Sequence, residues 1–298
     1  MYGACRLVSG FVLNNDKKTW ALKSSLQFLY KKFNVLVVST LFFLLLSDLI
    51  FQNNVIDSFF SFVKNGYWFT IALFEFFVLF ALIEFVIYKF NIKKHESVVL
   101  ILFALAVVST PFLSFILPSL NLNECKLYNL FGIKQFYFFI YFIFGVLVRK
   151  HFLYFEKYVF KDKPFALFLI VFTLSFVFNY LYNSSVPLSI IARLLEAFLG
   201  ILIVFYVFKK YSSFLCETTF VGKSLQYIGR RTLDIYLLHY FFLPKNVLML
   251  LHNDVSDPVS EFVIVVFFSI VTLFFCLVVS GIIRVSPSLA HLLFGVKK

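Results

Sequence analysis

Long apolar stretches separated by short polar connections make up most of the chain. A helix needs about 20 mainly apolar residues to cross the hydrocarbon core of a bilayer, so each such stretch predicts a membrane-spanning helix. The stretches are residues 33–51, 67–88, 98–117, 135–148, 165–182, 188–208, 233–250 and 261–283. The pattern therefore predicts an all-α fold, a polytopic transmembrane bundle of about eight helices.

The distribution of Lys and Arg predicts the orientation of these helices, because cytoplasmic connections are enriched in both residues. Every second connection is basic: residues 14–32, 89–97, 149–164, 209–232 and 284–298 together carry 21 of them. The intervening segments, 52–66, 118–134, 183–187 and 251–260, carry three. We expect both termini in the cytoplasm, since an even number of crossings returns the chain to its starting side.

The composition favours a membrane protein over a soluble one. Of the 298 residues, 61% are hydrophobic and 14% are charged, whereas soluble domains have about 45–50% apolar and about 25% charged residues. The net charge of +12 comes mainly from the basic connections, so we expect the lipid bilayer as a partner and no nucleic acid. A single membrane domain is expected over residues 1–298, with a stub and basic segment at 1–32, the helices at 33–283 and a cytoplasmic tail at 284–298.

The sequence gives no sign of a metal or redox centre. No two of the four cysteines, Cys5, Cys125, Cys216 and Cys276, have CxxC spacing, which is the spacing typical of such sites. The chain also contains no HExxH pattern and no phosphate-cradling glycine loop. We therefore expect no bound metal.

Ionisable side chains inside the predicted helices are candidates for function, because a charge within the bilayer is costly. Glu75 is expected about 12 Å from the outer end of its helix at 1.5 Å per residue, which favours a buried network or a functional role. Asp48 and Glu84 lie nearer to helix ends, where structural roles are expected. Arg193 and Glu196 share a helix face, so they can form a local ion pair, or Arg193 can contact an anionic or sugar substrate.

The segment 229–239, with the sequence GRRTLDIYLLH, concentrates polar side chains at the start of one predicted helix. Thr232 is expected to cap this helix, with Asp234 in its first turn, where a carboxylate is stabilised. Tyr236 and His239 face the same way, with His239 about 9 Å from the cytoplasmic end. A lone His in an apolar helix is more often structural than catalytic.

Two further residues of this segment are ambiguous. Arg230 and Arg231 can bind phosphate groups through their forked donors. The positive-inside bias, however, places basic residues at this position in any case.

Five short motifs follow one another along the chain. They are a Ser-Gly-Phe motif at 7–11, an aromatic and basic run at 28–33, a Tyr-Trp-Phe signature followed by Glu75 at 66–75, an aromatic helix ending in Gly at 139–145, and the segment 229–239. Together they resemble acyltransferase family 3, the multi-pass membrane proteins that transfer acyl groups to carbohydrates. The last motif is the most specific, with Thr232 in the place of the family's Ser.

The resemblance implies an enzyme that transfers acyl groups other than amino-acyl groups. We expect acyl-CoA as the donor, with no tightly bound cofactor, and acetyl as the acyl group. The expected acceptor is a hydroxyl of a cell-surface or extracellular carbohydrate. The expected location is the inner membrane of a bacterial cell, as a multi-pass protein.

The resemblance also suggests roles for particular residues. His239 is the candidate catalytic residue, with a supporting or donor-side role, and Arg230 and Arg231 are candidates to bind the phosphates of CoA. The candidate lining of the substrate cavity is Tyr67, Trp68, Glu75, Arg193 and Tyr236.

The N-terminal region departs from the family pattern. The family's first helix carries an Arg and a His that is its candidate base, and no residue before Ser9 matches that His, as if one N-terminal hairpin were missing. Val37 and Val38 stand where the family has a Pro. Two alternatives stay open: an inactive, truncated acyltransferase remnant, and a glycan transporter or flippase, although no internal pseudo-symmetry is visible.

Overall fold

The computed structural model describes residues 20–61, 63–91, 98–107, 138–181, 186–243 and 258–295, together with residues 109 and 129. All regular structure in these residues is helical, as predicted. The chain divides into two compact units, described separately below: unit 1 comprises residues 1–27 and 75–216, and unit 2 comprises residues 28–74 and 217–298. The Ser-Gly-Phe motif at 7–11 lies outside the described residues.

Four helices of the described part are long and apolar enough to cross a membrane: Leu22–Phe51, Trp68–Lys89, Asp162–Asn179 and Phe262–Val285. They correspond to the predicted spans 33–51, 67–88, 165–182 and 261–283. A further helix, α11 (Val186–Lys210), covers the predicted span 188–208. The predicted spans 98–117, 135–148 and 233–250 are described only in part, so eight crossings and two cytoplasmic termini stay predictions.

The first long helix is continuous but not uniform. It consists of α2 (Leu22–Lys32), the π-helical segment η1 (Phe33–Val38) and α3 (Ser39–Phe51). Val37 and Val38, which stand where the resemblance implies a Pro, lie in η1. Because each keeps the backbone N–H that Pro lacks, both can donate a helical hydrogen bond, and the helix continues through η1 into α3.

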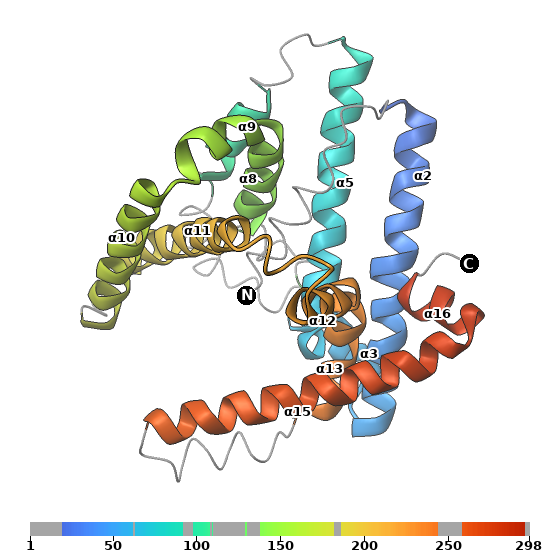
Figure 1. Cartoon of the computed structure of the whole chain (residues 1–298). Coiled ribbons are helices and arrows are strands. Elements are labelled where there is room, and N and C mark those ends of the chain that lie inside the picture. Colours follow the sequence, from blue (N-terminus) through green and yellow to red (C-terminus); the bar gives the residue numbers. More distant parts are fainter. Residues whose placement is uncertain are drawn as a thin grey trace. The chain divides into compact units, whose positions relative to one another are not determined.

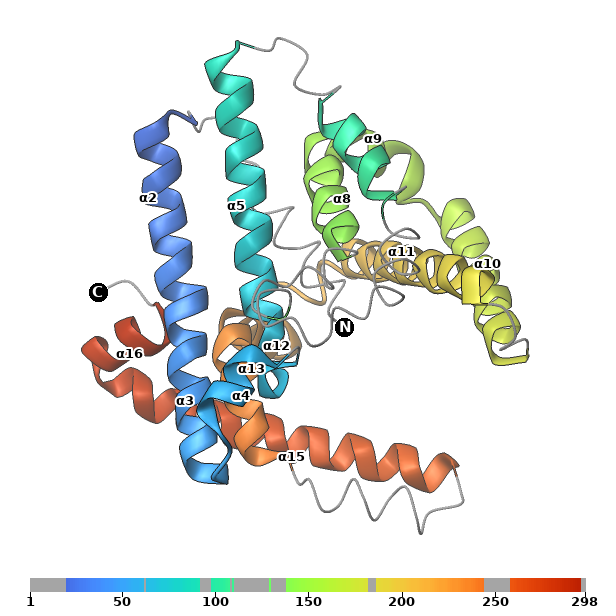
Figure 2. The ribbon, with the colours of Figure 1, turned by 180° about the vertical axis from the view of Figure 1, so that it is seen from behind.

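Asp48 organises the connection from α3 to α5 (Trp68–Lys89). Its Oδ1 accepts hydrogen bonds from the Ser58 hydroxyl at 3.0 Å and from the Asn65 side-chain amide at 2.5 Å. These bonds fix α4 (Val55–Phe60), which lies beside α3 (Figure 2), and η2 (Lys64–Gly66). Asp48 is only 1% exposed, so its structural role is a buried network and not contact with the membrane interface.

The core of unit 2 joins α3 to three C-terminal helices: α13 (Thr232–Phe242), α15 (Pro258–Val285) and α16 (Pro287–Phe294), as Figure 1 shows. Its buried residues are Phe43, Leu44, Tyr67, Leu237, Leu238, Cys276, Leu293 and Phe294. The Ser286 hydroxyl caps α16, Pro287 begins it and Gly295 ends it in a left-handed conformation, which favours glycine. The predicted tail therefore carries a helix that folds into the core.

Aromatic packing dominates unit 1. The middle of α5 presents Phe76, Phe77 and Phe80 to Phe142 of α8 (Phe139–Lys150), with ring centroids 5.5–6.0 Å apart. Most of α8 is buried, so this short helix forms the interior of the unit. Two short segments follow it, α9 (Phe152–Tyr154) and η5 (Phe155–Val159).

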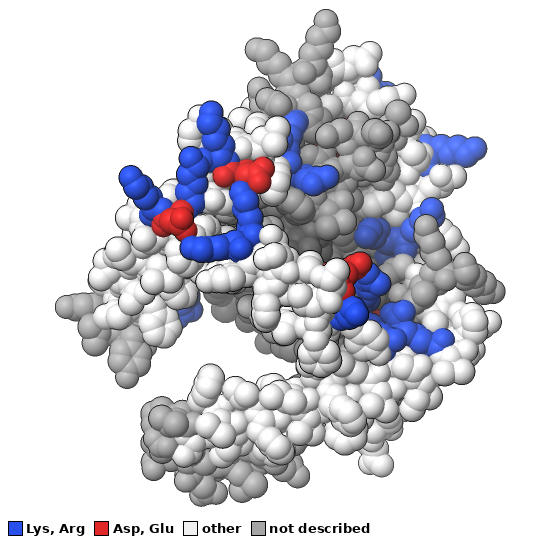
Figure 3. Space-filling view, viewed as in Figure 1, with Lys and Arg blue, Asp and Glu red and all other residues white. Residues whose placement is uncertain are grey.

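The helices α10 (Asp162–Leu181) and α11 form an antiparallel hairpin in unit 1. The ring of Phe165 stacks on that of Tyr206 at 4.2 Å, and the Tyr206 hydroxyl donates to Asp162. Lys and Arg gather with acidic side chains where η5 and the ends of α10 and α11 meet (Figure 3). Two ion pairs belong to this cluster, Lys209–Glu156 at 3.0 Å and Lys210–Asp162 at 2.8 Å.

The alternating orientation can be tested by labelling single cysteines in a variant whose four native cysteines are replaced. We expect Leu225→Cys to react with a membrane-impermeant maleimide from the cytoplasmic side and Ser256→Cys from the opposite side, since one predicted span separates them. Reaction of both from the same side of the bilayer would contradict the predicted topology.

Candidate functional site

The backbone carbonyl of Gly66 is the meeting point of α13 and the start of α5. It accepts hydrogen bonds from the hydroxyls of Tyr236 at 2.8 Å and Tyr240 at 2.9 Å. The Tyr236 hydroxyl also accepts from the backbone N–H of Phe69 at 3.3 Å. In the opposite direction, the buried Tyr67 hydroxyl donates to the carbonyl of Leu237 at 3.0 Å. Each of two segments that lie 170 residues apart in the sequence therefore donates a hydrogen bond to the other.

Glycine is required at position 66 for two independent reasons. Its φ is +96°, a conformation that side chains oppose, and a Cβ atom there would overlap the ring of Tyr240. The preceding residues Lys64 and Asn65 also have positive φ values, 45° and 51°. This turn places the Gly66 carbonyl within reach of both tyrosine hydroxyls.

His239 lies one turn beyond Tyr236 on α13 and is half-buried. Its Nδ1 is 2.6 Å from the carbonyl oxygen of Tyr236. A backbone carbonyl can only accept, so Nδ1 must carry the hydrogen in this contact. Neutral His239 therefore keeps the lone pair on Nε2, while its ring packs on Tyr240 with centroids 3.8 Å apart.

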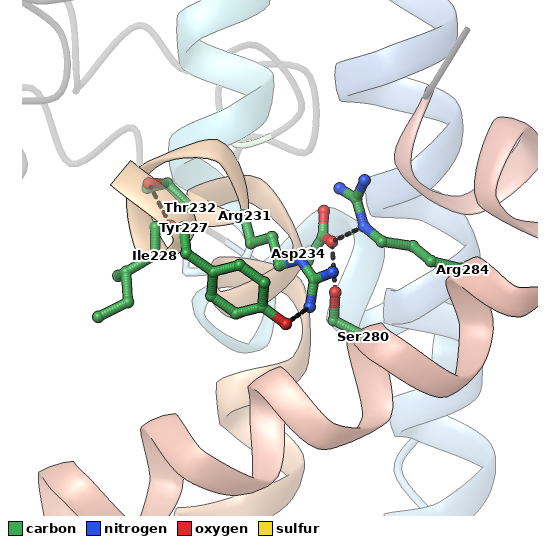
Figure 4. Close-up of polar contacts among 7 residues, drawn as sticks. All are labelled: Tyr227, Ile228, Arg231, Thr232, Asp234, Ser280 and Arg284. Carbon is green, nitrogen blue, oxygen red and sulfur yellow. Dashed lines mark hydrogen bonds and ion pairs between the residues drawn. The ribbon is translucent and has the colours of Figure 1, made fainter. Parts of the chain in front are cut away.

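An ion pair between the buried Asp234 and the half-buried Arg284 holds the start of α13 (Figure 4). Asp234 Oδ2 accepts hydrogen bonds from Arg284 Nε at 2.8 Å and from the Ser280 hydroxyl at 2.6 Å, both on α15. Asp234 lies in the first turn of α13, as predicted. The carboxylate thus joins two helices at the start of the most specific motif.

The expected cap at Thr232 is wrong. Thr232 is the first residue of α13, which has no side-chain cap, and its hydroxyl donates instead to the Gly229 carbonyl at 2.8 Å. It therefore satisfies the end of the preceding helix, α12 (Phe220–Arg230). The prediction of a cap fails because only Arg231 separates α12 from α13. No extended residue therefore precedes Thr232.

The two arginines of the motif have different surroundings. Arg230 forms an exposed ion pair with Glu217 at 2.8 Å. The guanidinium of Arg231 lies over the ring of Tyr227, 4.1 Å from its centroid, and donates to the hydroxyl of that residue (Figure 4). Arg231 forms no ion pair with any described residue, so its charge is available for an anion.

Comparison with protein families decides the assignment. The model of the acyltransferase domain matches residues 7–281, most of the chain. The chain belongs to acyltransferase family 3. Together with its apolar helices, this makes it an acyltransferase-like membrane protein. Searches of curated proteins and of solved structures found no significant match.

The structure brings together some of the site residues expected in this family member and separates others. Tyr67, Trp68, Tyr236 and His239 gather around the start of α5 in unit 2. Glu75 follows two turns after Trp68 on α5 and is half-buried.

The remaining ionisable candidates lie in unit 1. Glu84 is buried. Arg193 is exposed, while the Glu196 carboxylate accepts hydrogen bonds from Asn179 and Ser175. Contact of Arg193 or Glu75 with a substrate stays a prediction.

Several residues of the candidate site have no strong signal in the sequence. In the sequence, Arg284 is one basic residue of a predicted cytoplasmic connection, and Ser280 is one small residue of an apolar span. Only the fold brings both side chains to Asp234. Tyr240 follows His239 directly, but only the turn at Gly66 gives its hydroxyl a partner. For Tyr240, the spacing Tyr236-x-x-x-Tyr240 was a usable signal, because residues four apart share a helix face.

A double-mutant cycle measures the ion pair of Asp234 with Arg284. We expect Asp234→Asn and Arg284→Gln each to destabilise the protein, with a coupling of about 1–3 kcal/mol, because Arg284→Gln leaves the buried Asp234 carboxylate without its cation and Asp234→Asn removes the anion that the half-buried Arg284 contacts. The exposed pair Glu217–Arg230 is the matched control, for which Glu217→Gln and Arg230→Gln should couple by less than about 0.5 kcal/mol. Unfolding in mixed micelles gives the free energies, and equal coupling in both pairs would refute a special role for Asp234.

The requirement for glycine at position 66 is tested against a second glycine. We expect Gly66→Ala to lower the free energy of unfolding by roughly 2 kcal/mol, because it combines an unfavourable φ with a clash against Tyr240. Gly229→Ala should be neutral or stabilising by up to about 1 kcal/mol, since no atom lies within 4 Å of the added Cβ. A Gly66→Ala protein as stable as Gly229→Ala would contradict the packing described.

Proposed function

We propose that this protein transfers an acyl group, acetyl in the first instance, from cytoplasmic acyl-CoA to a hydroxyl of a cell-surface or extracellular carbohydrate. Membership of the family supports acyl transfer. The donor, the carbohydrate acceptor and a location in the inner membrane are part of the proposal. They follow from the resemblance and from the basic cytoplasmic connections expected for the chain.

The 2.6 Å contact between His239 Nδ1 and the Tyr236 carbonyl oxygen is the observation that carries the proposal, because a carbonyl partner favours the tautomer with its hydrogen on Nδ1. In acyl transfer, the acceptor oxygen bonds to the thioester carbonyl carbon, the bond to sulfur breaks and the hydroxyl proton must leave. A neutral imidazole with a free lone pair on Nε2 can take that proton and pass it to the departing CoA thiolate. Protonation of the departing thiolate is the donor-side role expected for His239. Removal of the proton from the acceptor hydroxyl extends that role, because no residue before Ser9 matches the first-helix His that the resemblance implies as the base.

The other residues of the motif suit the binding of the donor. Arg231 offers a guanidinium without a carboxylate partner among the described residues, and such a group binds phosphate through two donors. Arg230 can contribute once it exchanges Glu217 for a phosphate, because an exposed ion pair is weak. Tyr67, Trp68 and Tyr236, with Glu75 further along α5, are proposed to line the substrate cavity. Contact of Arg193, on α11 of unit 1, with the substrate stays a separate prediction from the sequence.

Replacement of His239 by Asn tests its role in transfer. The Asn side-chain amide can keep the hydrogen bond to the Tyr236 carbonyl but provides no base at the position of Nε2. We expect acyl transfer to fall about 100-fold or more, while the thermal stability changes little. The assay supplies labelled acetyl-CoA to membrane vesicles that contain the protein and measures label in the carbohydrate fraction.

His291→Asn is the matched control, because His291 is exposed on α16. We expect this variant to transfer like the unaltered protein. Full transfer by His239→Asn would exclude His239 from the reaction. No transfer by the unaltered protein would refute the proposed activity and favour the inactive remnant.

A further inference from the structure

The aromatic ring of Tyr240 is packed against the turn that precedes α5. A Cβ atom at Gly66 would overlap this ring, so the ring lies directly against the backbone of Gly66. The ring of Tyr67 meets it edge to face, with centroids 4.9 Å apart, and the ring of Tyr236 does so at 6.3 Å. The Tyr240 hydroxyl donates to the Gly66 carbonyl at 2.9 Å. Packing and a directional bond together therefore set the position of the ring.

The imidazole of His239 has two close neighbours, the Tyr240 ring and a backbone oxygen. The centroids of the two rings are 3.8 Å apart, and Nδ1 of His239 is 2.6 Å from the Tyr236 carbonyl oxygen. The carbonyl contact favours the tautomer with its hydrogen on Nδ1. The Tyr240 ring fills the space on one side of the imidazole, so it restricts rotation of the imidazole away from the carbonyl.

The Tyr240 hydroxyl is committed to this arrangement. A tyrosine hydroxyl carries a single hydrogen, and Tyr240 donates it to the Gly66 carbonyl. The hydroxyls of Tyr67 and Tyr236 likewise donate to the carbonyls of Leu237 and Gly66. The contribution of Tyr240 is therefore packing and orientation, and not the transfer of a proton.

We propose that Tyr240 is a positioning residue for acyl transfer, which holds the His239 imidazole with Nδ1 at the Tyr236 carbonyl and leaves Nε2 for the reacting groups. Tyr240 acts through His239, so this proposal rests on the proposed function. A displacement of about 1 Å can lower the rate of a reaction about 100-fold. Loss of Tyr240 should therefore lower kcat and leave the affinity for the donor unchanged.

Two variants of the full chain divide the contribution of Tyr240. Tyr240→Phe keeps the ring and removes the bond to the Gly66 carbonyl, whereas Tyr240→Leu removes the ring as well. We expect kcat for acetyl transfer in membrane vesicles to fall about tenfold in the first variant and about 100-fold in the second. KM for acetyl-CoA should stay within about twofold in both, since the change affects the reacting geometry and not donor binding.

The tautomer of His239 is measured independently of activity. In protein labelled with a heavy nitrogen isotope in histidine, the NMR shift of each ring nitrogen reports whether it carries a hydrogen, and the His239 signals are identified by their loss in His239→Asn. At alkaline pH, where an ordinary histidine is neutral, we expect hydrogen mainly on Nδ1 in the unaltered protein. The form with hydrogen on Nε2 should increase in Tyr240→Phe and further in Tyr240→Leu, because the imidazole is no longer held at the carbonyl.

Tyr206→Phe is the matched control, because it removes a hydroxyl that is hydrogen-bonded to Asp162 and Lys210 in unit 1. We expect this variant to keep the kcat and the His239 tautomer of the unaltered protein. The same result in both Tyr240 variants would overturn the proposal, as would a fall in kcat without a change of tautomer. If Tyr240→Leu does not fold, Tyr240→Phe decides. If the unaltered protein transfers no acetyl group, the proposed function fails, and the tautomers alone decide whether Tyr240 orients His239.

Discussion

The short helix α13 is held at both of its ends, and the position of His239 depends on both attachments. At its start, the Asp234 carboxylate is bonded to Arg284 and Ser280 of α15. Further along, the hydroxyls of Tyr236 and Tyr240 share the carbonyl of Gly66. An apolar helix has few directional contacts in a membrane. These polar bonds therefore determine how α13 is rotated about its axis and where it lies along that axis. His239 lies between the two attachments.

The apolar stretches were sufficient to predict an all-helical fold, because the length needed to cross a bilayer is visible in the sequence. Short elements were missed. The helix α16 lies in a segment read as a tail, and α12 is an amphipathic helix in a connection read as a basic loop. Neither has the length of a span, and both are stabilised by capping and packing that become apparent only in the folded chain.

The candidate site was predictable in part, because polar residues are conspicuous within an apolar helix. The polar residues of the segment 229–239 stand out against apolar neighbours, so Asp234, Tyr236 and His239 were visible candidates. Their partners were not, because Gly66 and Arg284 lie 170 and 50 positions away from the residues they bind. The failed cap at Thr232 has a local cause: two helices follow one another too closely for the usual capping geometry.

The contact between His239 and the Tyr236 carbonyl limits how this imidazole can handle protons. A histidine that relays protons takes one up at one ring nitrogen and releases another from the opposite nitrogen. Here Nδ1 holds its hydrogen against a backbone oxygen at 2.6 Å, and that oxygen cannot take it away. Any proton that binds to Nε2 must therefore also leave from Nε2. The imidazole can accept and release a proton on one side, but it cannot relay a proton from one ring nitrogen to the other.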